Sequence, residues 1–274
     1  MLPPLWVDRG QVISFKKAPP AGSTHRCVGV ARLGSVQTSG TLFTLWAQLR
    51  GSAWVDSKDG RFRLSAHEWI AFEKDSVPHV TADRNGVCIG IALGVDALQM
   101  LSESHIGLYA GRGSMSHAET RVLFRLWRAI QADGGEASAL RPLLLHIASL
   151  QSELAEAVQR CPGRSRQRRQ QVFGRMQRAR QYLEGNSHRV VRIDELAELT
   201  SFSSCYLTKT FQSLYAESPQ SLSSRMRLDR AAQLLRDTDM LVSEVASASG
   251  FDNNCSFARA FRQRFGVTAR EFRG

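Results

Sequence analysis

A lysine and an arginine stand at matching positions of two similar segments in the last third of the chain. Lys209 belongs to residues 193–211 and Arg259 belongs to residues 242–261. Both segments have the periodicity of short helices, and the two cations lie opposite the apolar face. Ammonium and guanidinium groups can donate hydrogen bonds to phosphate oxygens, and to O6 and N7 of guanine. The chemistry that this arrangement favours is therefore recognition of a polyanion.

Apolar and turn-forming residues indicate how the two segments fold. Glu195-Leu196-Ala197 aligns with Glu244-Val245-Ala246 after a shift of 49 residues, and one extra turn residue follows in the second segment. The alanine of each triplet permits one helix to cross another closely, and Gly250 suits a turn with a positive φ. Ser203 and Asp252 are the residues expected to cap the second helix of each pair. Both segments are therefore predicted to be helix-turn-helix units.

A further helix is expected between the two units. It would begin at Ser218-Pro219, because proline is favoured in the first helical turn, and its apolar residues continue through Leu234-Leu235. Such a helix is long enough to act as a stiff spacer. Two recognition helices held on one face of duplex DNA could enter successive major grooves about one helical turn (~34 Å) apart.

Composition and charge agree with such a partner. The chain has 274 residues, a net charge of +11 and 43% apolar residues. Residues 164–274 carry 19 Lys and Arg against 11 Asp and Glu, while the residues before them carry 17 against 14. The positive surplus thus coincides with the repeated segments. No stretch resembles a membrane span or a secretory signal, so the cytoplasm is the expected compartment and no membrane partner is expected.

The first third of the chain has the pattern of β-strands. Short apolar segments alternate there with turns such as Asp59-Gly60 and Asn85-Gly86, which tolerate positive φ. The clearest strand segments are Leu42–Leu49, Phe62–Leu64 and Val87–Leu93. Repeated short strands over about residues 12–93 favour an antiparallel barrel or sandwich.

Helical periodicity begins at about residue 116 and continues to residue 160. It indicates amphipathic helices over residues 120–132 and 141–160. The second has heptad-like spacing, which suits either packing on its own barrel or pairing with a second subunit. Residues 161–171 are expected to form a basic linker, because Pro162-Gly163 stops the helix and arginines follow in a polar run.

The cysteines and histidines do not predict a metal site. Five scattered cysteines show no metal-binding spacing and suggest ordinary reduced thiols, with Cys161 in its basic stretch the best candidate for a sensor. A metal cupin enzyme would need H-x-H and a following Glu, and the sequence lacks that array. We therefore expect no metal, no cofactor and no enzymatic activity.

Residues 182–273 resemble the DNA-binding domain of the AraC/XylS family of bacterial regulators. The matching residues are Leu196-Ala197, Ser203, Tyr206-Leu207, Phe211, Ser218-Pro219, Arg227-Leu228, Ala231, Leu234-Leu235, Val245-Ala246, Gly250-Phe251, Phe257, Arg259, Phe261, Phe265-Gly266 and Phe272-Arg273. The sequence departs from the family at Ser201 and Ala216, where glycine is usual, and at Ala269, where proline is usual. The first unit is thus the less typical one.

The strand-rich part resembles the cupin-like effector domain of the family more loosely, at the Val77-Pro78-His79 corner. The expected fold is therefore α+β with two domains. Residues 1–160 would form a cupin-like antiparallel β-barrel with helices, for effector binding or dimerisation. Residues 172–274 would form an all-α domain with two helix-turn-helix motifs joined by a linker helix.

The resemblance also implies roles for the second helix of each unit, which contacts DNA bases in the family. The residues predicted to contact DNA are Cys205, Thr208, Lys209, Asn254, Cys255, Arg259 and Arg262. The two cysteines would touch thymine methyl groups or sugars, and Asn254 could pair with adenine. Arg259 suits guanine or a phosphate, and Arg227, Arg262 and Arg264 suit phosphates or internal ion pairs. The family further implies RNA polymerase as a partner and activation of transcription.

One strand face in the first domain is a candidate effector pocket. Trp46, Gln48 and Arg50 alternate along a strand opposite an apolar face, and His79 lies at the cupin-like corner. Together they could line a pocket for a small, anionic molecule, or Trp46, Gln48 and Arg50 could be a solvent-facing surface.

Three functions remain open from the sequence. The first is a sequence-specific regulator whose first domain senses a small molecule or a partner, or only dimerises without a small-molecule effector. The second is an enzyme tethered to DNA, for which no Cys/His cluster supplies an activated thiol. The third is a nonspecific architectural DNA-binding protein in which the first domain only dimerises, and its binding would depend steeply on salt.

Overall fold

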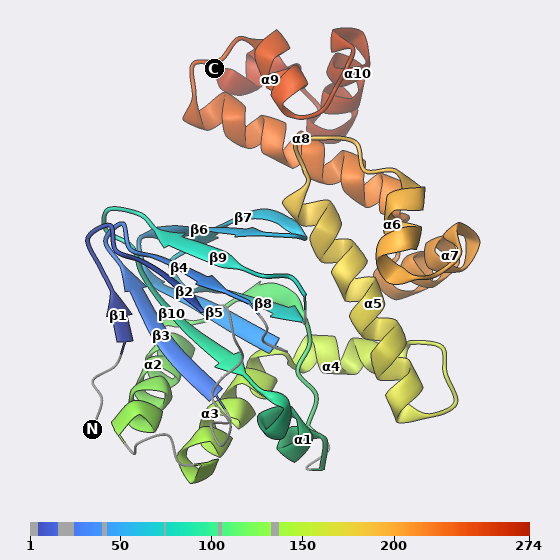
Figure 1. Ribbon diagram of the computed structural model, residues 1–274. Coiled ribbons are helices and arrows are strands. Elements are labelled where there is room, and N and C mark those ends of the chain that lie inside the picture. Colours follow the sequence, from blue (N-terminus) through green and yellow to red (C-terminus); the bar gives the residue numbers. More distant parts are fainter. Residues whose placement is uncertain (1–4, 16–24, 40–42, 74, 104–105, 133–136) are drawn as a thin grey trace. The chain divides into compact units, whose positions relative to one another are not determined.

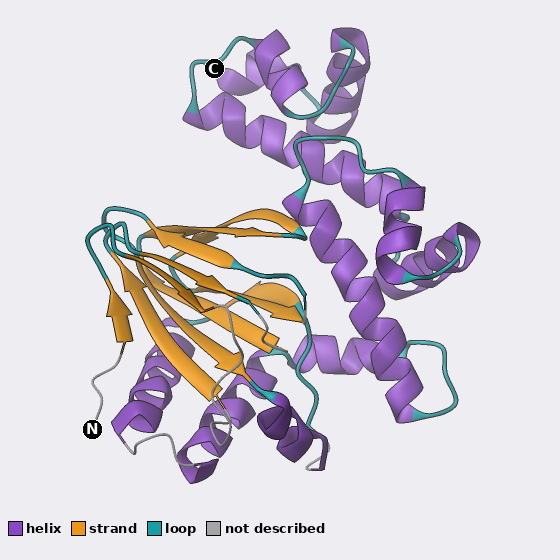
Figure 2. Ribbon diagram, in the orientation of Figure 1, coloured by secondary structure: helices purple, strands orange, loops and turns teal. Residues whose placement is uncertain are grey.

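The computed structural model describes residues 5–15, 25–39, 43–73, 75–103, 106–132 and 137–274. The chain folds into two compact units, residues 1–177 and 178–274, and each is described by itself (Figure 1). The first unit is rich in strands and the second is entirely helical where it has regular structure (Figure 2). The expected α+β composition, with the strands first and the helix-turn-helix region last, is confirmed.

The strands of the first unit make two sheets. The first sheet has the order β1 (Leu5–Val7), β3 (His25–Ala31), β10 (Val87–Leu93), β5 (Phe43–Arg50), β8 (Glu68–Glu73) and β11 (Gly111–Ser114). The second has the order β2 (Val12–Phe15), β4 (Ser35–Thr38), β9 (His79–Ala82), β6 (Ser52–Ser57) and β7 (Gly60–Ser65). Within the described residues neither sheet closes on itself, so the expected cupin-like barrel is not confirmed. The predicted strand at Val87–Leu93 matches β10 at both ends.

Two hydrophobic cores lie within the described residues of this unit. One lies between the sheets and contains Val30, Val55 and Phe72. The other covers the outer face of the first sheet, where Leu45 and Ile91 meet the helices. Side chains alternate along a strand, so a strand covered on both faces buries the side chains of both. β5 is such a strand, with Leu45 buried on one face and Thr44, Trp46 and Gln48 buried on the other.

In the described residues of this unit, four helices precede α5 and cover the first sheet or follow it. They are α1 (Val95–Glu103), α2 (His117–Ala132), α3 (Ala137–Leu150) and α4 (Ser152–Gln159). The single helix expected over residues 141–160 is therefore wrong, because it is interrupted at Gln151. The buried Gln151 side chain accepts from the Tyr109 amide at 3.0 Å and donates to the Tyr109 carbonyl at 2.8 Å. The break thus provides hydrogen-bond partners for the buried backbone N–H and C=O of Tyr109.

Helix α5 (Arg166–Gly185) replaces most of the expected linker. Arginine and glutamine are good helix formers, and Val172, Phe173 and Met176 give the helix a buried apolar stripe. The basic run at its start is therefore an ordered helix from Arg166 onward, not an irregular tether. α5 begins in the first unit and ends in the second.

The second unit continues with six helices. They are α6 (Ile193–Thr200), α7 (Ser204–Tyr215), α8 (Pro219–Asp237), α9 (Val242–Ala248), α10 (Asn254–Phe265) and α11 (Ala269–Arg273). The spacer helix starts with Ser218 as its N-cap and Pro219 in the first turn, as the sequence predicts. α8 contacts α7 as well as α9 and α10. Its residues Ala231 and Leu235 pack with Val245, Phe257 and Phe261 in one core.

Candidate nucleic-acid interface

The first helix-turn-helix consists of α6 and α7. Ser201 ends α6 in the left-handed region with a φ of 53°, and the Phe202 amide donates to the Ala197 carbonyl at 3.1 Å. The Ser203 hydroxyl accepts from the Tyr206 amide at 3.3 Å and caps α7, as the sequence predicts. α7 also ends on a left-handed residue, Ala216, with a φ of 60°.

The second helix-turn-helix, α9 and α10, repeats this backbone with glycines. Gly250 has a φ of 75°, and the Phe251 amide donates to the Ala246 carbonyl at 3.0 Å. Gly266 ends α10 with a φ of 78°. The cap is Asn253, whose Oδ1 accepts from the Cys255 amide at 2.7 Å and the Ser256 amide at 3.3 Å. The predicted cap, Asp252, is wrong by one residue, because the extra turn residue moves the cap to Asn253.

Gly250 is required for packing as well as for its φ. A Cβ atom there would lie 2.8 Å from the Arg189 Cα and 2.9 Å from the His188 carbonyl oxygen. These are backbone atoms, which cannot move aside as a flexible side chain could. The turn of the second helix-turn-helix is thus pressed against the segment that precedes α6.

Two arginines of α8 brace the same turn. The Arg227 Nη1 donates to the Gly250 carbonyl at 2.8 Å, and its guanidinium lies 4.5 Å from the Phe251 ring centroid. The Arg230 Nε donates to the Ala248 carbonyl at 3.2 Å. Carbonyls at a helix C-terminus carry partial negative charge, which cations stabilise. Of the two roles expected for Arg227, the structure therefore shows an internal one.

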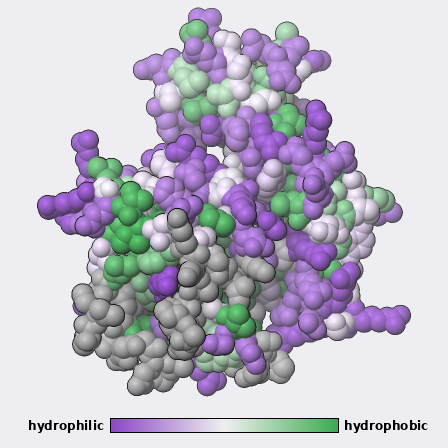
Figure 3. All heavy atoms as spheres, in the orientation of Figure 1, coloured by the Kyte–Doolittle hydropathy of each residue, from purple (hydrophilic) through white to green (hydrophobic). Residues whose placement is uncertain are grey.

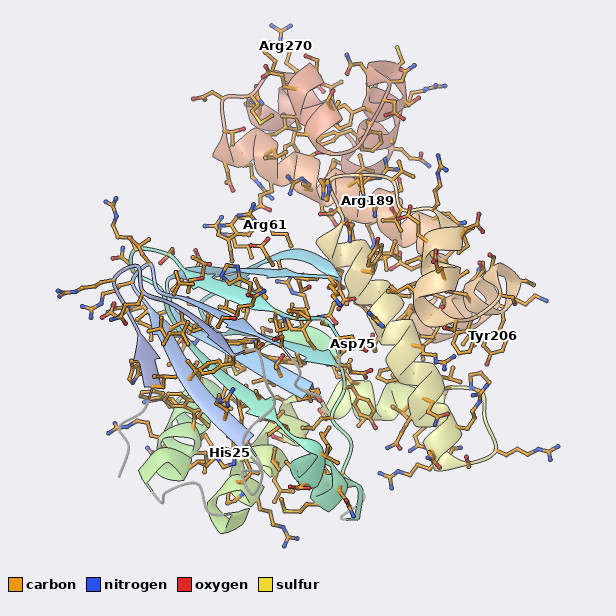
Figure 4. The ribbon with its side chains drawn as sticks, in the orientation of Figure 1. His25, Arg61, Asp75, Arg189, Tyr206 and Arg270 are labelled. Carbon is orange, nitrogen blue, oxygen red and sulfur yellow. The ribbon has the colours of Figure 1, made fainter. Side chains whose placement is uncertain are left out.

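An ion pair stabilises the first helix-turn-helix from its N-terminal side. The Arg189 Nη2 lies 2.8 Å from the Glu195 Oε2 and also donates to the Tyr182 hydroxyl at 2.9 Å (Arg189 is labelled in Figure 4). Glu195 further accepts from the Arg192 amide at 3.0 Å. The hydrogen bond from Arg189, and then the one from the Arg192 amide, lower the pKa of Glu195 to about 2.

In each helix-turn-helix, the predicted contact residues lie on one side of the second helix. Cys205, Lys209, Asn254, Cys255, Arg259 and Arg262 are exposed, while Thr208 is half-buried. The Thr208 hydroxyl donates to the Ser204 carbonyl at 2.8 Å. Spacings of three, four and seven residues place such side chains on one helical face. In the view of Figure 3, residues 178–274 present mainly hydrophilic surface, with smaller hydrophobic patches among it.

The same helical spacing identifies a residue that the sequence reasoning missed. Gln212 is exposed and lies seven residues after Cys205, as Arg262 lies seven after Cys255. The seven-residue interval was visible in the sequence and would have found it. Arg264 instead forms an ion pair at the surface, where its Nη2 lies 2.6 Å from the Asp229 Oδ1.

The candidate effector residues do not all come together. Trp46 and Gln48 are 1% and 0% exposed and point from β5 into the space between the sheets. Arg50 is exposed at the strand end, where its Nε lies 3.4 Å from the Asn85 carbonyl. His79 belongs to the other sheet, with its Nε2 2.6 Å from the Ser35 Oγ. Trp46 and Gln48 are thus not a solvent-facing surface.

The structure also bears on the Cys161 thiol, on metal-binding side chains and on membrane-spanning helices. Cys161 is buried, and burial raises the pKa of its thiol to about 11, so the basic stretch does not make it a reactive thiolate. The described residues contain no group of three or more His, Cys, Asp and Glu side chains that could hold a metal ion. No described helix is long and apolar enough to cross a membrane.

Comparison with known proteins agrees with this geometry. Residues 196–274 match the family model described as a helix-turn-helix domain. These residues form a DNA-binding domain of the AraC type. The chain is 36% identical to HTH-type transcriptional regulator GbdR of Pseudomonas aeruginosa over 91 residues, which are 33% of this chain and 25% of that protein. It is 30% identical to regulator CdhR of the same species over 214 residues, 68% of this chain and 62% of that protein.

A solved structure with a similar sequence is a probable AraC family transcriptional regulator from Rhodopseudomonas palustris. It is 35% identical and covers 36% of this chain and 93% of that one, with a TM-score of 0.34. The chain spans a quarter of GbdR and less than two thirds of CdhR. What those whole proteins do is therefore carried to this chain only as a proposal.

Proposed function

We propose that this chain is a sequence-specific transcription activator of the AraC/XylS type in which α7 and α10 read DNA bases. The observation that carries the proposal is that both second helices present donors on one exposed face, at equivalent positions. Each is capped by a side chain and packed on its first helix, so the donors are held by rigid elements. Recognition helices of this motif contact bases in the major groove.

Each contact residue has a proposed role. Lys209 and Arg259 donate to O6 and N7 of guanine, and Asn254 pairs with adenine through both polar atoms of its amide. Arg262 binds a phosphate. Cys205, Thr208 and Cys255 present small apolar groups to thymine methyls or sugars. The phosphate contact positions the helix, while the base contacts confer the sequence preference.

The first unit is proposed to control this binding, by sensing a small molecule and by forming a homodimer in the cytoplasm. Three polar atoms support the sensing role, namely the Thr44 Oγ1, the Trp46 Nε1 and the Gln48 Oε1. All are buried on one face of β5 and have no hydrogen-bond partner in the described part of the chain. Buried polar groups are nearly always satisfied, so these three atoms are the ones that a small polar ligand of this unit would satisfy. RNA polymerase is the proposed partner for activation.

The test of sequence-specific binding is selection of DNA by the full-length protein from fragmented genomic DNA. Enriched fragments should share one motif, and binding to it at physiological salt should exceed binding to unrelated DNA by about a thousandfold or more. Arg259→Ala should weaken binding to the motif, whereas Arg121→Ala, which removes an exposed arginine of α2, should not. Loss of the preference at physiological salt would instead identify a nonspecific architectural protein.

The domain division is tested by producing residues 161–274 alone. We propose that this fragment is soluble and binds the selected motif, because the core formed by α8 to α11 lies within it. An unfolded fragment, or one that does not bind DNA, would contradict the division into residues 1–160, 161–171 and 172–274.

A further inference from the structure

Two histidines lie side by side in the first unit. His67 belongs to the turn between β7 and β8, and His117 is the first residue of α2. Their ring centroids are 4.1 Å apart, and the ring planes are inclined to each other by 57°. The two residues are separated by 50 positions in the sequence. The fold therefore brings together two imidazoles that no sequence motif links.

The backbone holds His67 in a fixed place. Its amide donates to the Gln48 carbonyl at 2.8 Å, and its carbonyl accepts from the Met115 amide at 2.7 Å. Its φ of 67° lies in the left-handed region, which residues other than glycine rarely adopt. Such a conformation persists only where the surrounding structure enforces it, and it is frequent at functional sites. His67 is thus anchored between β5 and the segment that leads into α2.

A hydrogen bond from Nδ1 orients the His67 ring. The Thr120 Oγ1 lies 3.0 Å from the His67 Nδ1 and donates its single proton to the Ser116 carbonyl at 2.9 Å. The hydroxyl can therefore only accept from His67, so Nδ1 carries the ring proton and Nε2 keeps the free lone pair. Histidines that bind metals usually donate from their second nitrogen in this way. The ring is thus prepared to act as a ligand through Nε2.

The remaining ring nitrogens are available. Among the residues that the structure describes, neither the His67 Nε2 nor the ring of His117 has a hydrogen-bond partner. His67 is half-buried and His117 is exposed, so the His117 ring can turn toward the His67 Nε2. His146 differs from this pair, because its Nε2 lies 3.1 Å from the Glu119 carbonyl oxygen. Two imidazole nitrogens can therefore face one solvent-accessible point.

The charges around the pair suit a cation. Glu119 lies in the first turn of α2, and its carboxylate accepts from the Ser116 amide at 2.7 Å. That hydrogen bond lowers the pKa of Glu119, so its side chain is ionised at neutral pH. Its negative charge offsets the partial positive charge at the start of the helix. Glu68, which follows His67, pairs with Arg112 at 3.3 Å and so adds no net charge.

The distance between the rings indicates which metal fits. An ion about 2.0–2.1 Å from each nitrogen lies about 3.2 Å from each ring centroid. Two ligands at about 90° then have centroids about 4.5 Å apart, and two at a tetrahedral angle about 5.2 Å apart. The observed 4.1 Å is nearer to the first value. Angles of about 90° are typical of Cu²⁺ and Ni²⁺ sites, whereas Zn²⁺ prefers tetrahedral ones.

We propose that His67 and His117 bind one divalent transition-metal ion, Ni²⁺ or Cu²⁺, with water completing its coordination. His67 supplies Nε2, and Thr120 is the positioning residue that orients its ring. A site with two protein ligands agrees with the finding that the described residues contain no metal-binding group of three. β7 and β8 belong to different sheets, so the ion links the turn between the sheets to the helix that covers one of them. The bound metal therefore stabilises the first unit.

Binding is tested with Ni²⁺ on the untagged full-length protein, because Ni²⁺ does not oxidise the exposed cysteine thiols. Calorimetric titration of the chelator-treated protein should give one ion per chain. His67→Gln and His117→Gln should each weaken binding by about tenfold or more, since each removes a ligand. Thr120→Val leaves both ligands but removes the orienting partner, and should weaken binding by about tenfold. His146→Gln is the matched control and should leave the affinity unchanged.

Thermal stability and coordination give two further readouts. Ni²⁺ at about a hundredfold above its Kd should raise the unfolding temperature of the first unit, followed by tryptophan fluorescence, by about 5 °C. The rise should be absent in His117→Gln, whose exposed side chain can be replaced without loss of the fold even if His67→Gln does not fold. X-ray absorption at the nickel edge should show two imidazole ligands. Zn²⁺ should bind more weakly than Ni²⁺.

Absence of Ni²⁺ binding would overturn the site. Binding that neither histidine substitution weakens, or that His146→Gln weakens equally, would identify an adventitious ion only and would also overturn it. A single imidazole in the absorption spectrum would exclude the pair as ligands, and tighter binding of Zn²⁺ than of Ni²⁺ would overturn the geometry. None of these outcomes involves DNA, so the inference stands or fails independently of the proposed function.

Discussion

The two helix-turn-helix units share a backbone and differ in the residues that occupy it. Each helix-turn-helix reaches the left-handed region after its first helix and again after its second, but the second helix-turn-helix uses Gly250 and Gly266 where the first has Ser201 and Ala216. Non-glycine residues pay a steric penalty of about 1–2 kcal/mol in that region. The first helix-turn-helix therefore has the same turn geometry as the second, at a cost in stability that the second avoids.

Their recognition helices differ in charge as well. α10 carries three arginines, whereas α7 carries a single lysine. Arginine binds phosphates and guanine through two parallel hydrogen bonds, which lysine cannot do. If both helices contact DNA as proposed, α10 should supply more of the electrostatic attraction and α7 should depend more on direct contact with bases.

The largest expected effect is that of Gly250→Ala on the stability of the second unit. The variant combines a left-handed φ with a Cβ pressed against backbone, so we expect a loss of about 3 kcal/mol or more. Far-UV circular dichroism during denaturation measures it. All five tryptophans precede residue 128, so their fluorescence reports the first unit and should not change.

Gly266→Ala is the matched control for that experiment. Gly266 has a similar φ of 78° but nothing lies within 4 Å of the added Cβ. It should cost only about 1 kcal/mol. Equal losses for the two variants would show that the contact with residues 188–189 does not matter.

The next effect concerns DNA affinity. Lys209→Ala and Arg259→Ala should each weaken binding to the selected motif by about 1–3 kcal/mol, because each removes a base contact. Gel-shift titration at several salt concentrations measures both affinity and its salt dependence. A variant that binds the motif as tightly as the parent protein would remove that residue from the interface.

Gln212→Arg sharpens the charge comparison. It gives α7 the arginine that α10 has at Arg262, so the affinity should rise and the salt slope should steepen by about one unit. Arg262→Gln is the reverse change and should do the opposite. If neither changes the salt slope, this turn of the helices does not face the phosphates.

The helix-turn-helix units could be predicted because their signals are local. Gly250, Pro219 and the phenylalanines at four-residue spacing act within one or two helical turns, and the structure confirms the helices they imply. The cap of α10 could not be decided in this way, since Asp252 and Asn253 are neighbours and both are good caps. Only the position of the extra turn residue chooses between them.

The first unit was less predictable because its arrangement depends on pairings distant in sequence. β5 lies between β10 and β8, and no local pattern states that both of its faces are covered. From the sequence alone, the face of Trp46 and Gln48 could therefore be interpreted as either a pocket or a solvent-facing surface. The break at Gln151 likewise depends on Tyr109, which lies 42 residues earlier.

A smaller gain in stability is expected from Ser201→Gly and Ala216→Gly. Each places glycine where the structure has a non-glycine residue in the left-handed region. Each should therefore stabilise the helical unit, residues 178–274, by about 1 kcal/mol. Circular dichroism during denaturation again measures the change. The exposed Ser213, which lies within α7 and is helical, gives the control Ser213→Gly, which should destabilise instead. If Ser201→Gly and Ala216→Gly both lower the stability of the helical unit, the strain assigned to the first helix-turn-helix is refuted.

The smallest expected effect is the acid sensitivity of the first helix-turn-helix. The pKa of Glu195 is lowered from 4.5 to about 2, chiefly by Arg189, so the ionised carboxylate is stabilised in the folded state. Its contribution is therefore fully present above about pH 4.5 and is lost as the pH falls toward 2. Glu195→Gln should lower the unfolding temperature of the helical unit at neutral pH and reduce its decline over that interval. Glu198→Gln, which removes an exposed carboxylate of the same helix, should retain the parent profile. A parent-like profile for Glu195→Gln would mean that the ion pair does not hold α6 in place.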